Sequence, residues 1–295
     1  MSGVDGVLVI DKPAGMTSHD VVARVRRAAG QRKVGHAGTL DPDATGVLVV
    51  CLGRATRLVP YVQAAQKTYD ARLRLGQTTT TLDAAGDILE TADASAVDEP
   101  ALCAALTSFV GTIEQIPPMV SAVKVGGERL HVKARRGEVV ERPPRTVTIH
   151  DIVLEDFQPG PRGEAAFLVT CSSGTYVRTL AADVGERLGV GAHLVALRRL
   201  GSGRFSLDQA LDLGKVAELG AEGRLDEALL SMAEAVADYP RVELDEGQAV
   251  ALSHGRSLSP TGHDGPVAAL DPAGRLLAMV ADRDGVARPL AVLRG

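Results

Sequence analysis

A single acidic side chain, Asp41, stands in a glycine-rich loop with the sequence Gly35-His36-Ala37-Gly38-Thr39-Leu40-Asp41-Pro42-Asp43-Ala44-Thr45-Gly46. The apolar run Val47–Leu52 follows this loop at once. Glycines allow another molecule to come close to the backbone, because they carry no side chain. An acid held in such a loop indicates a carboxylate that does chemistry, as a nucleophile or as an acid and base.

Two other interpretations of this loop remain open at the level of the loop alone. Asp41-Pro42-Asp43-Ala44-Thr45 fits the D-x-D-x-T pattern of magnesium-dependent phosphatases that form an aspartyl phosphate. That chemistry needs a hydrophobic strand running into the first aspartate, whereas here the strand comes afterwards. The second alternative is an Asp-Pro turn without catalytic meaning, since both residues are common in turns.

Length and composition indicate a globular protein with one large domain and a small one. The chain has 295 residues, of which 45% are hydrophobic. No apolar run approaches the roughly 20 residues of a membrane span, and the first residues lack the pattern of a signal peptide. Cys51, Cys103 and Cys171 form no CxxC pair, so we expect neither a zinc site nor a disulfide framework. This cysteine usage fits the reducing cytoplasm.

The net charge of −5 conceals an uneven distribution. Residues 206–295 carry eight basic and fifteen acidic side chains. Residues 24–33 carry five cations and no acid, and residues 124–145 carry seven cations against three glutamates. Clustered arginine on an acidic protein favours a polyanion-binding face, with solvated helix faces as the alternative.

Hydrophobic periodicity and turn residues predict an α+β fold with a mostly antiparallel sheet. The expected strands lie at 7–10, 47–52, 67–75, 147–156 and 165–171. The expected helices lie at about 18–29, 100–111, 175–188, 193–200 and 245–253. Residues 76–97 are polar and acidic and are expected to form a loop. A boundary is expected at Tyr239-Pro240, followed by a tail with one helix and several short strands.

Several blocks of the sequence, taken in order, resemble the TruB-type tRNA pseudouridine synthases. The blocks are Gly6–Ser18, Gly35–Gly46, Lys67–Tyr69, Pro117–Lys124, Cys171–Leu180, Leu197–Arg199 and Gly203–Phe205. Together they span about residues 6–205. A set of ordered blocks is far more specific than any single motif, so the resemblance outweighs the phosphatase pattern.

The resemblance implies that the chain converts uridine-55 in the T loop of tRNA to pseudouridine, without a cofactor or a metal. The N1–C1′ bond breaks, the uracil turns, and C5 bonds to C1′. The family pattern gives three catalytic roles. Asp41 is the nucleophile, Tyr69 is the ring that stacks on the flipped uracil, and Arg178 is the cation that keeps the carboxylate ionised in a dry pocket.

Four further residues are expected to bind the substrate. The resemblance makes His36 the residue that enters the space vacated in the T loop, and it makes Leu200 a lining of the uracil pocket. Tyr176 and Lys12 are expected to support that pocket. Each assignment has a structural alternative: core packing for Tyr69, a backbone-bonded loop histidine for His36, and a packing role for the others.

The insertion at 124–145 resembles a segment that closes over the T loop. The cations expected to contact the RNA backbone are Lys124, Arg135, Arg136 and Arg142. Val120 and His131 stand where the family often has tyrosine, and at these two positions the chain departs from the ring contacts with RNA that the resemblance implies.

The expected domains are a pseudouridine synthase catalytic domain, 1–238, and a small β-rich domain resembling a PUA module, 239–295. The expected fold of the first is a mixed, mostly antiparallel sheet flanked by helices. The expected partner is the tRNA T stem-loop, with no membrane and no obligate protein partner, and we expect a cytoplasmic monomer.

Two rival functions share these features. One is a non-catalytic RNA-binding protein with the same fold, which has no use for Asp41, Tyr69 and Arg178 together. The other is a guide-RNA-dependent pseudouridine synthase. The short tail and the absence of a lysine-rich extension argue against it.

Overall fold

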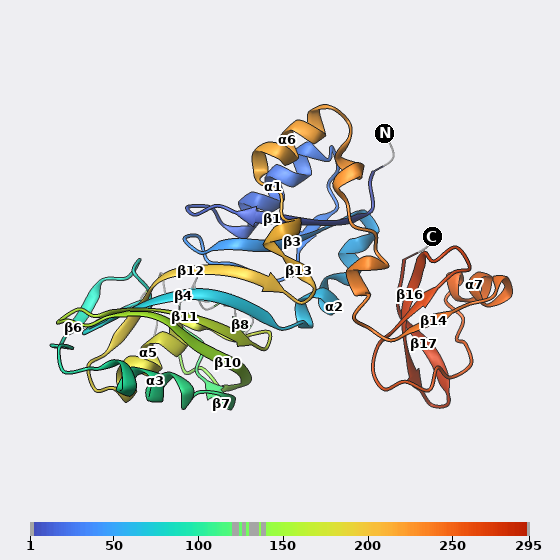
Figure 1. The fold of residues 1–295 in the computed structure, drawn as a ribbon. Coiled ribbons are helices and arrows are strands. Elements are labelled where there is room, and N and C mark those ends of the chain that lie inside the picture. Colours follow the sequence, from blue (N-terminus) through green and yellow to red (C-terminus); the bar gives the residue numbers. More distant parts are fainter. Residues whose placement is uncertain (1–2, 120–123, 126–127, 130–135, 137–139, 294–295) are drawn as a thin grey trace. The chain divides into compact units, whose positions relative to one another are not determined.

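The computed structural model describes residues 3–119, 124–125, 128–129, 136 and 140–293 (Figure 1). The chain folds into two compact units, one formed by residues 1–65 and 202–295 and the other by residues 66–201. Within the described residues, no helix combines the length and the apolar character that a membrane crossing requires.

The first unit is built around β3 (Thr45–Leu52), with which both β1 (Gly6–Lys12) and β2 (Val34–His36) pair in antiparallel fashion. Strands β1 and β3 are buried almost throughout. A strand covered on both faces reads as a continuous apolar run, which is why these two strands were predictable without any alternation.

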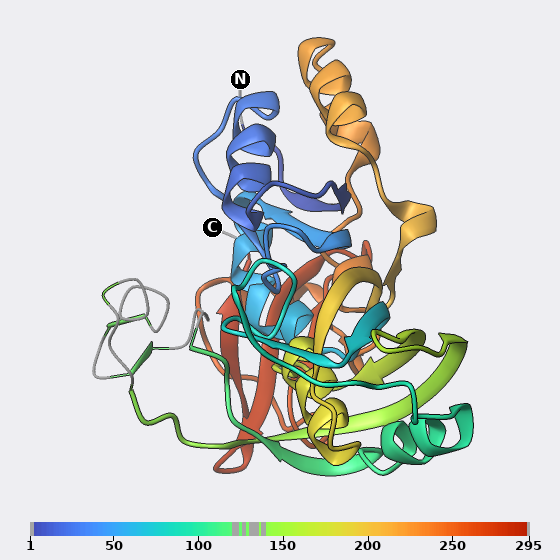
Figure 2. The same ribbon diagram turned by 90° about the vertical axis from the view of Figure 1, so that its left-hand side faces the viewer.

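Helix α1 (Ser18–Ala28) begins where the sequence predicts it. Thr17 caps its first turn, and the Asp20 side chain bonds back to Thr17 in a capping box. One face of the helix buries valines against the strands, and Gly30, with a φ of 58°, ends the segment. Helix α6 (Leu213–Ala221) packs beside α1 (Figure 2).

The rest of the first unit consists of short helices and the C-terminal sheet. A 3-10 turn (Gly53–Leu58) leads into α2 (Val59–Ala64), and β13 (Phe205–Ser206) and three further 3-10 turns (Leu207–Gln209, Leu225–Ala228 and Glu234–Val236) belong to the return of the chain. The C-terminal elements are α7 (Glu246–Ser253), β14 (Arg241–Glu243), β15 (Val267–Leu270), β16 (Leu276–Arg283) and β17 (Val286–Val292). The expected helix and strands of the tail are therefore confirmed.

The C-terminal sheet has the strand order β14-β15-β16-β17, in which β14 and β15 run parallel and the other neighbours antiparallel. One face of this sheet shares a hydrophobic cluster with β1 and β3, which includes Val7, Val49 and Met279. A second cluster, which includes Leu252 of α7, covers other residues of the sheet.

The second unit is a sheet with the strand order β12-β4-β11-β10-β7. Its strands are β4 (Lys67–Leu75), β7 (Gly111–Gln115), β10 (Arg145–Gln158), β11 (Glu164–Cys171) and β12 (Ala192–Ser202), of which Ser202 falls in the first unit. The β4–β11, β11–β10 and β10–β7 ladders are antiparallel. Helices α3 (Glu99–Thr107) and α5 (Val177–Arg187) contact each other and the strands β10 and β4. These elements confirm the α+β class.

Two sequence-based expectations about the second unit are wrong. Residues 193–200, expected as a helix, lie in strand β12 next to β4. Residues 76–97, expected as a loop, contain the antiparallel pair β5 (Gln77–Thr79) and β6 (Ile88–Thr91). Strand β6 is exposed along its whole length, so it lacks the buried alternation by which a strand is recognised. A second small pair joins β8 (Lys124–Val125) to β9 (Glu128–Arg129).

Candidate active site

The loop that carries Asp41 runs from β2 to β3 and is tied down on both sides of the aspartate. The buried Ser18 hydroxyl accepts a hydrogen bond from the Leu40 amide at 2.9 Å and lies 3.1 Å from the Leu40 carbonyl. The Ala44 amide donates to the Asp41 carbonyl at 3.2 Å. Gly38 and Gly46 have φ values of 100° and 98°, where side chains are strained. The Asp41 side chain is half-buried in this braced loop.

Lys12 provides the other brace of this loop. Its side chain is fully buried, and its ammonium group donates to the carbonyls of Pro13, Met16 and Pro42 at 2.9, 2.6 and 2.8 Å. Pro42 directly follows Asp41. The sequence predicted a supporting role for Lys12, and these bonds give such a role a physical form: the lysine joins β1, the start of α1 and the Asp41 loop.

Replacing Lys12 by Met is expected to lower the free energy of unfolding by about 3 kcal/mol, because three backbone carbonyls lose the charged donor that the buried lysine provides. Urea denaturation followed by circular dichroism measures this change. Lys33→Met is the matched control, since Lys33 is exposed and exposed substitutions stay within about 0.5 kcal/mol. Equal denaturation midpoints for the two variants would refute the bracing role.

His36 is the last residue of β2, and its backbone pairs with Val50 of β3. Its ring is half-buried and makes an edge-to-face contact with the His19 ring, with centroids 5.4 Å apart. His19 belongs to α1. The sequence alone does not predict this contact, because a lone histidine on a helix forms no recognisable pattern. Asp41, His36 and Lys12 thus all lie in the first unit.

Tyr69, Tyr176, Arg178 and Leu200 lie in the second unit. Tyr69 is in β4 opposite Val169 of β11, and it is 8% exposed. The alternation predicted for β4 is confirmed, since the residues on the face of Tyr69 are buried. Leu200 is half-buried in β12.

Arg178 is the second residue of α5, as expected for a side chain at a turn-to-helix junction. It is 5% exposed, and one of its guanidinium nitrogens donates to the Asp83 carboxylate at 3.1 Å. Asp83 is itself positioned: its other carboxylate oxygen accepts bonds from the Thr81 hydroxyl at 2.6 Å and the Ala85 amide at 3.1 Å. The residue before it, Leu82, has a φ of 64°, which is strained for a side chain of this size.

Asp83 is the residue that the sequence did not reveal. It stands first in an acidic segment of six carboxylates, and no local feature distinguishes it from the others. Its turn is fixed by β12, since the Leu194 amide donates to the Leu82 carbonyl and the Ala84 amide donates to the Leu194 carbonyl, at 3.0 and 2.9 Å. Residues 193–200, expected as a helix, are therefore hydrogen-bonded to residues 76–97, expected as a loop, at the turn that holds Asp83.

The backbone of Tyr176 is held by a buried amide side chain. Gln115, at the end of β7, accepts a bond from the Tyr176 amide at 3.0 Å and donates to the Tyr176 carbonyl at 3.2 Å. Gln115 is 1% exposed, so it serves as a fixed clamp. Gln115 thus fixes the turn that leads into α5, the helix that carries Arg178.

Lys67 is a second buried lysine, in register with Cys171 on the neighbouring strand. Burial, and after it the charge of Arg199, lower the pKa of Lys67 to about 8. Burial also raises the pKa of the Cys171 thiol to about 11. The thiol therefore stays protonated at neutral pH, and a buried thiol of this kind is inert.

The stability of the protein relative to a Lys67→Met variant is expected to rise between about pH 8 and pH 10.5. Below this window the lysine is charged in both the folded and the unfolded state, so the cost of burying the charge is fully present. Within the window the folded state has already lost the proton while the unfolded state keeps it, and the cost is relieved. The gain is roughly 3 kcal/mol. Denaturation midpoints of both proteins that run parallel across this range would refute the burial argument.

The expected RNA contacts fall only partly within the described residues. Arg142 donates to the Pro117 carbonyl at 2.9 Å, which ties the end of the insertion to the segment that precedes it. Arg136 is exposed. Lys124 pairs through its backbone with Arg129, whereas Arg135, Val120 and His131 lie outside the described residues. Among the residues that are described, no group of three His, Cys, Asp or Glu side chains gathers as a metal site would require.

Family models match nearly the whole chain. Residues 26–177 match the TruB family pseudouridylate synthase N-terminal domain, residues 178–237 the tRNA pseudouridylate synthase B C-terminal domain, and residues 239–294 the C-terminal domain of tRNA pseudouridine synthase II. The fold and these matches define a class: the chain belongs to the TruB family of pseudouridylate synthases. The chain is therefore an enzyme that isomerises uridine in tRNA.

Individual relatives support the same family assignment. The tRNA pseudouridine synthase B of Thermobifida fusca is 50% identical over 99% of both chains. That of Corynebacterium efficiens is 50% identical over 94% of this chain and 92% of its own. Among solved structures, a Cbf5-Nop10-Gar1 complex contains a chain that is 28% identical, with a TM-score of 0.77 over 98% of this chain and 84% of its own.

Proposed function

We propose that this enzyme acts alone on uridine-55 in the T loop of tRNA, and that Asp41 is its nucleophile. The reaction is an isomerisation. The N1–C1′ bond breaks and a C5–C1′ bond forms, the C5 proton leaves, and N1 takes up a proton, so no oxidant or reductant is consumed. The reaction therefore needs a carboxylate, a cation and an aromatic ring that holds the base, and it needs no cofactor.

The observation that carries the proposal is the bracing of Asp41. Its neighbours Leu40 and Pro42 are each bonded to a buried side chain, Ser18 and Lys12. A loop that only turned the chain would not need two buried polar anchors, since burying a polar group costs free energy. Holding a nucleophile in one geometry lowers the barrier of an attack that depends on orientation.

The remaining roles follow the family pattern. We assign Tyr69 to stacking on the extruded uracil, Arg178 to the cation of the reaction, and His36 to the space that the uridine leaves in the T loop. Tyr176 and Leu200 complete the base-binding residues, and Lys12 positions the Asp41 loop. Lys124, Arg135, Arg136 and Arg142 contact RNA phosphates.

The domain boundary that we propose lies near residue 239, with a catalytic domain at 1–238 and a PUA-like domain after it. A separate family model that begins at residue 239 supports this boundary. We propose that the enzyme works as a cytoplasmic monomer without a protein partner. A relative that matches over 99% of both chains is a tRNA pseudouridine synthase B, which favours this over a guide-dependent assembly.

Mapping the position of pseudouridine in a tRNA transcript tests the proposed function. The wild-type protein, with chelator present, is expected to form pseudouridine at position 55 and to leave a transcript with cytidine at that position unmodified. Modification of another uridine, or activity only in the presence of an added guide RNA, would overturn it.

A further inference from the structure

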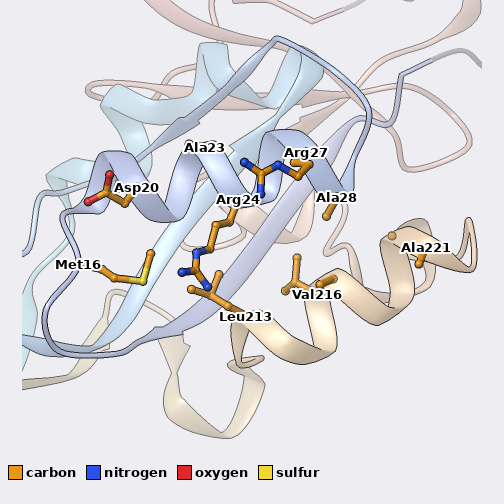
Figure 3. A pocket seen from close by; sticks show the side chains of 11 residues that line it. Met16, Asp20, Ala23, Arg24, Arg27, Ala28, Leu213, Val216 and Ala221 are labelled. Carbon is orange, nitrogen blue, oxygen red and sulfur yellow. The ribbon is translucent and has the colours of Figure 1, made fainter.

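A groove runs between α1 and α6 in the first unit (Figure 3). It has a volume of about 730 Å³ and is lined by Arg24 and Arg27 on one side and by Leu213, Val216 and Ala217 on the other. The two helices approach each other closely at one end, because a Cβ at Gly220 would lie 2.6 Å from the Ala28 carbonyl oxygen. Small residues, among them Ala28 and Gly220, thus line the groove together with the two arginines.

The acids that border this groove are already engaged. The Asp20 carboxylate accepts bonds from the Thr17 hydroxyl and amide at 2.6 and 2.9 Å in the helix cap. On the α6 side, Glu218 pairs with Lys215 at 2.6 Å and Glu222 pairs with Arg224 at 2.7 Å. None of these acids forms an ion pair with a groove arginine among the residues that the structure describes.

No described acid that borders the groove therefore neutralises Arg24 or Arg27, and both can pair with another molecule. Arg24 and Arg27 are exposed and form no ion pair with any described residue, and the same holds for Arg32 just beyond the helix. Two other exposed arginines of this unit, Arg224 and Arg288, are paired instead, the first with Glu222 and Glu227 and the second with Asp284. A second hollow, of about 570 Å³, adjoins the end of α1 and shares Arg27 with the groove.

We propose that this groove and the adjoining hollow bind the sugar–phosphate backbone of the tRNA substrate outside its T loop. The proposal rests on the proposed function, because it names a further contact of the same substrate. Arginine is suited to phosphate, which it binds through two parallel hydrogen bonds. The groove offers no aromatic ring among its described lining residues and, Asp20 being engaged, no free carboxylate, so the contact does not depend on base sequence.

The position of α1 connects this surface to the Asp41 loop. Ser18, the first residue of the helix, is hydrogen-bonded to Leu40, the residue before Asp41. At 1.5 Å per residue, Arg24 and Arg27 lie about 9 and 14 Å along the helix from that contact. An RNA strand that brings one nucleotide to Asp41 has further phosphates within reach of these guanidinium groups.

The salt dependence of tRNA binding tests the proposal. The test protein carries Arg24→Gln and Arg27→Gln, and the control carries Arg224→Gln and Arg288→Gln, so both lose two positive charges from the same unit. Filter binding of a full-length tRNA transcript is measured between about 50 and 200 mM salt. The plot of log K against log salt is expected to become shallower by about 1.4 to 1.8 in the test protein, at roughly 0.7 to 0.9 per phosphate contact. A fourfold rise in salt then weakens its binding about 7- to 12-fold less than that of the wild-type protein.

An unchanged slope of log K against log salt in the test protein, or an equal change in the control, would overturn the proposal. An acidic protein would then be the expected partner of the groove. Denaturation midpoints of both variants, expected to match the wild-type protein, exclude a folding defect. Pseudouridine formation by the wild-type protein separates the two claims. If the wild-type protein modifies tRNA but the slopes are equal, the groove proposal fails while the proposed function stands.

Discussion

Asp41→Asn is expected to abolish pseudouridine formation, with a loss of at least about 10⁴-fold in kcat, because an amide lacks the charge and the nucleophilicity of a carboxylate. Binding of tRNA is expected to stay close to that of the wild-type protein, since phosphate contacts provide most of the affinity. Nucleoside analysis of tRNA after prolonged incubation measures the first quantity, and filter binding the second.

Asp43→Asn is the matched control for this loss. Asp43 lies in the same loop, is exposed, and differs from Asp41 by two positions. It is expected to retain nearly full activity, which also excludes the D-x-D-x-T interpretation, in which both acids are needed. Equal activity of the two variants would remove Asp41 from the role of nucleophile.

The second large effect is expected at Asp83. Asp83→Asn removes the negative charge that faces Arg178 at 3.1 Å and leaves a guanidinium that is 5% exposed without this ion pair. A misplacement of about 1 Å in a catalytic constellation costs on the order of 100-fold, so we expect kcat to fall by about that factor while KM changes little. Single-turnover kinetics at saturating enzyme measure the effect.

Asp87→Asn provides the control for this variant. Asp87 is exposed in the same polar segment, and the structure records hydrogen bonds of its backbone but no ion pair of its side chain with a described residue. An equal loss in both variants would assign the effect to the charge of the segment. A normal kcat for Asp83→Asn would show that Arg178 is held without it.

Several elements of both units were predictable because each has a local signal. The valines of α1 recur at helical spacing behind a Thr17 cap, and β4 alternates through Tyr69, Ala71, Leu73 and Leu75. Short-range patterns of this kind are decided by the chain itself. The same is true of the tail, whose helix starts at the cap Asp245.

Strand β12 was not predicted because its leucines recur at a spacing that suits a helix. Leu194, Leu197 and Leu200 recur at intervals of three, which suits a helix face, yet the segment becomes a strand beside β4. Tertiary pairing overrides local propensity in such cases. Asp83 was hidden for a related reason, since its partner Arg178 lies 95 positions away in the sequence.

Release of tritium from tRNA labelled at C5 of uridine is the most direct test of Asp41 as the nucleophile, because the C5–H bond breaks only when the base is isomerised. The wild-type protein and Asp43→Asn are expected to release one equivalent of tritium for each uridine-55, and Asp41→Asn none above background. Release by Asp41→Asn at a rate near that of the wild-type protein would contradict this role.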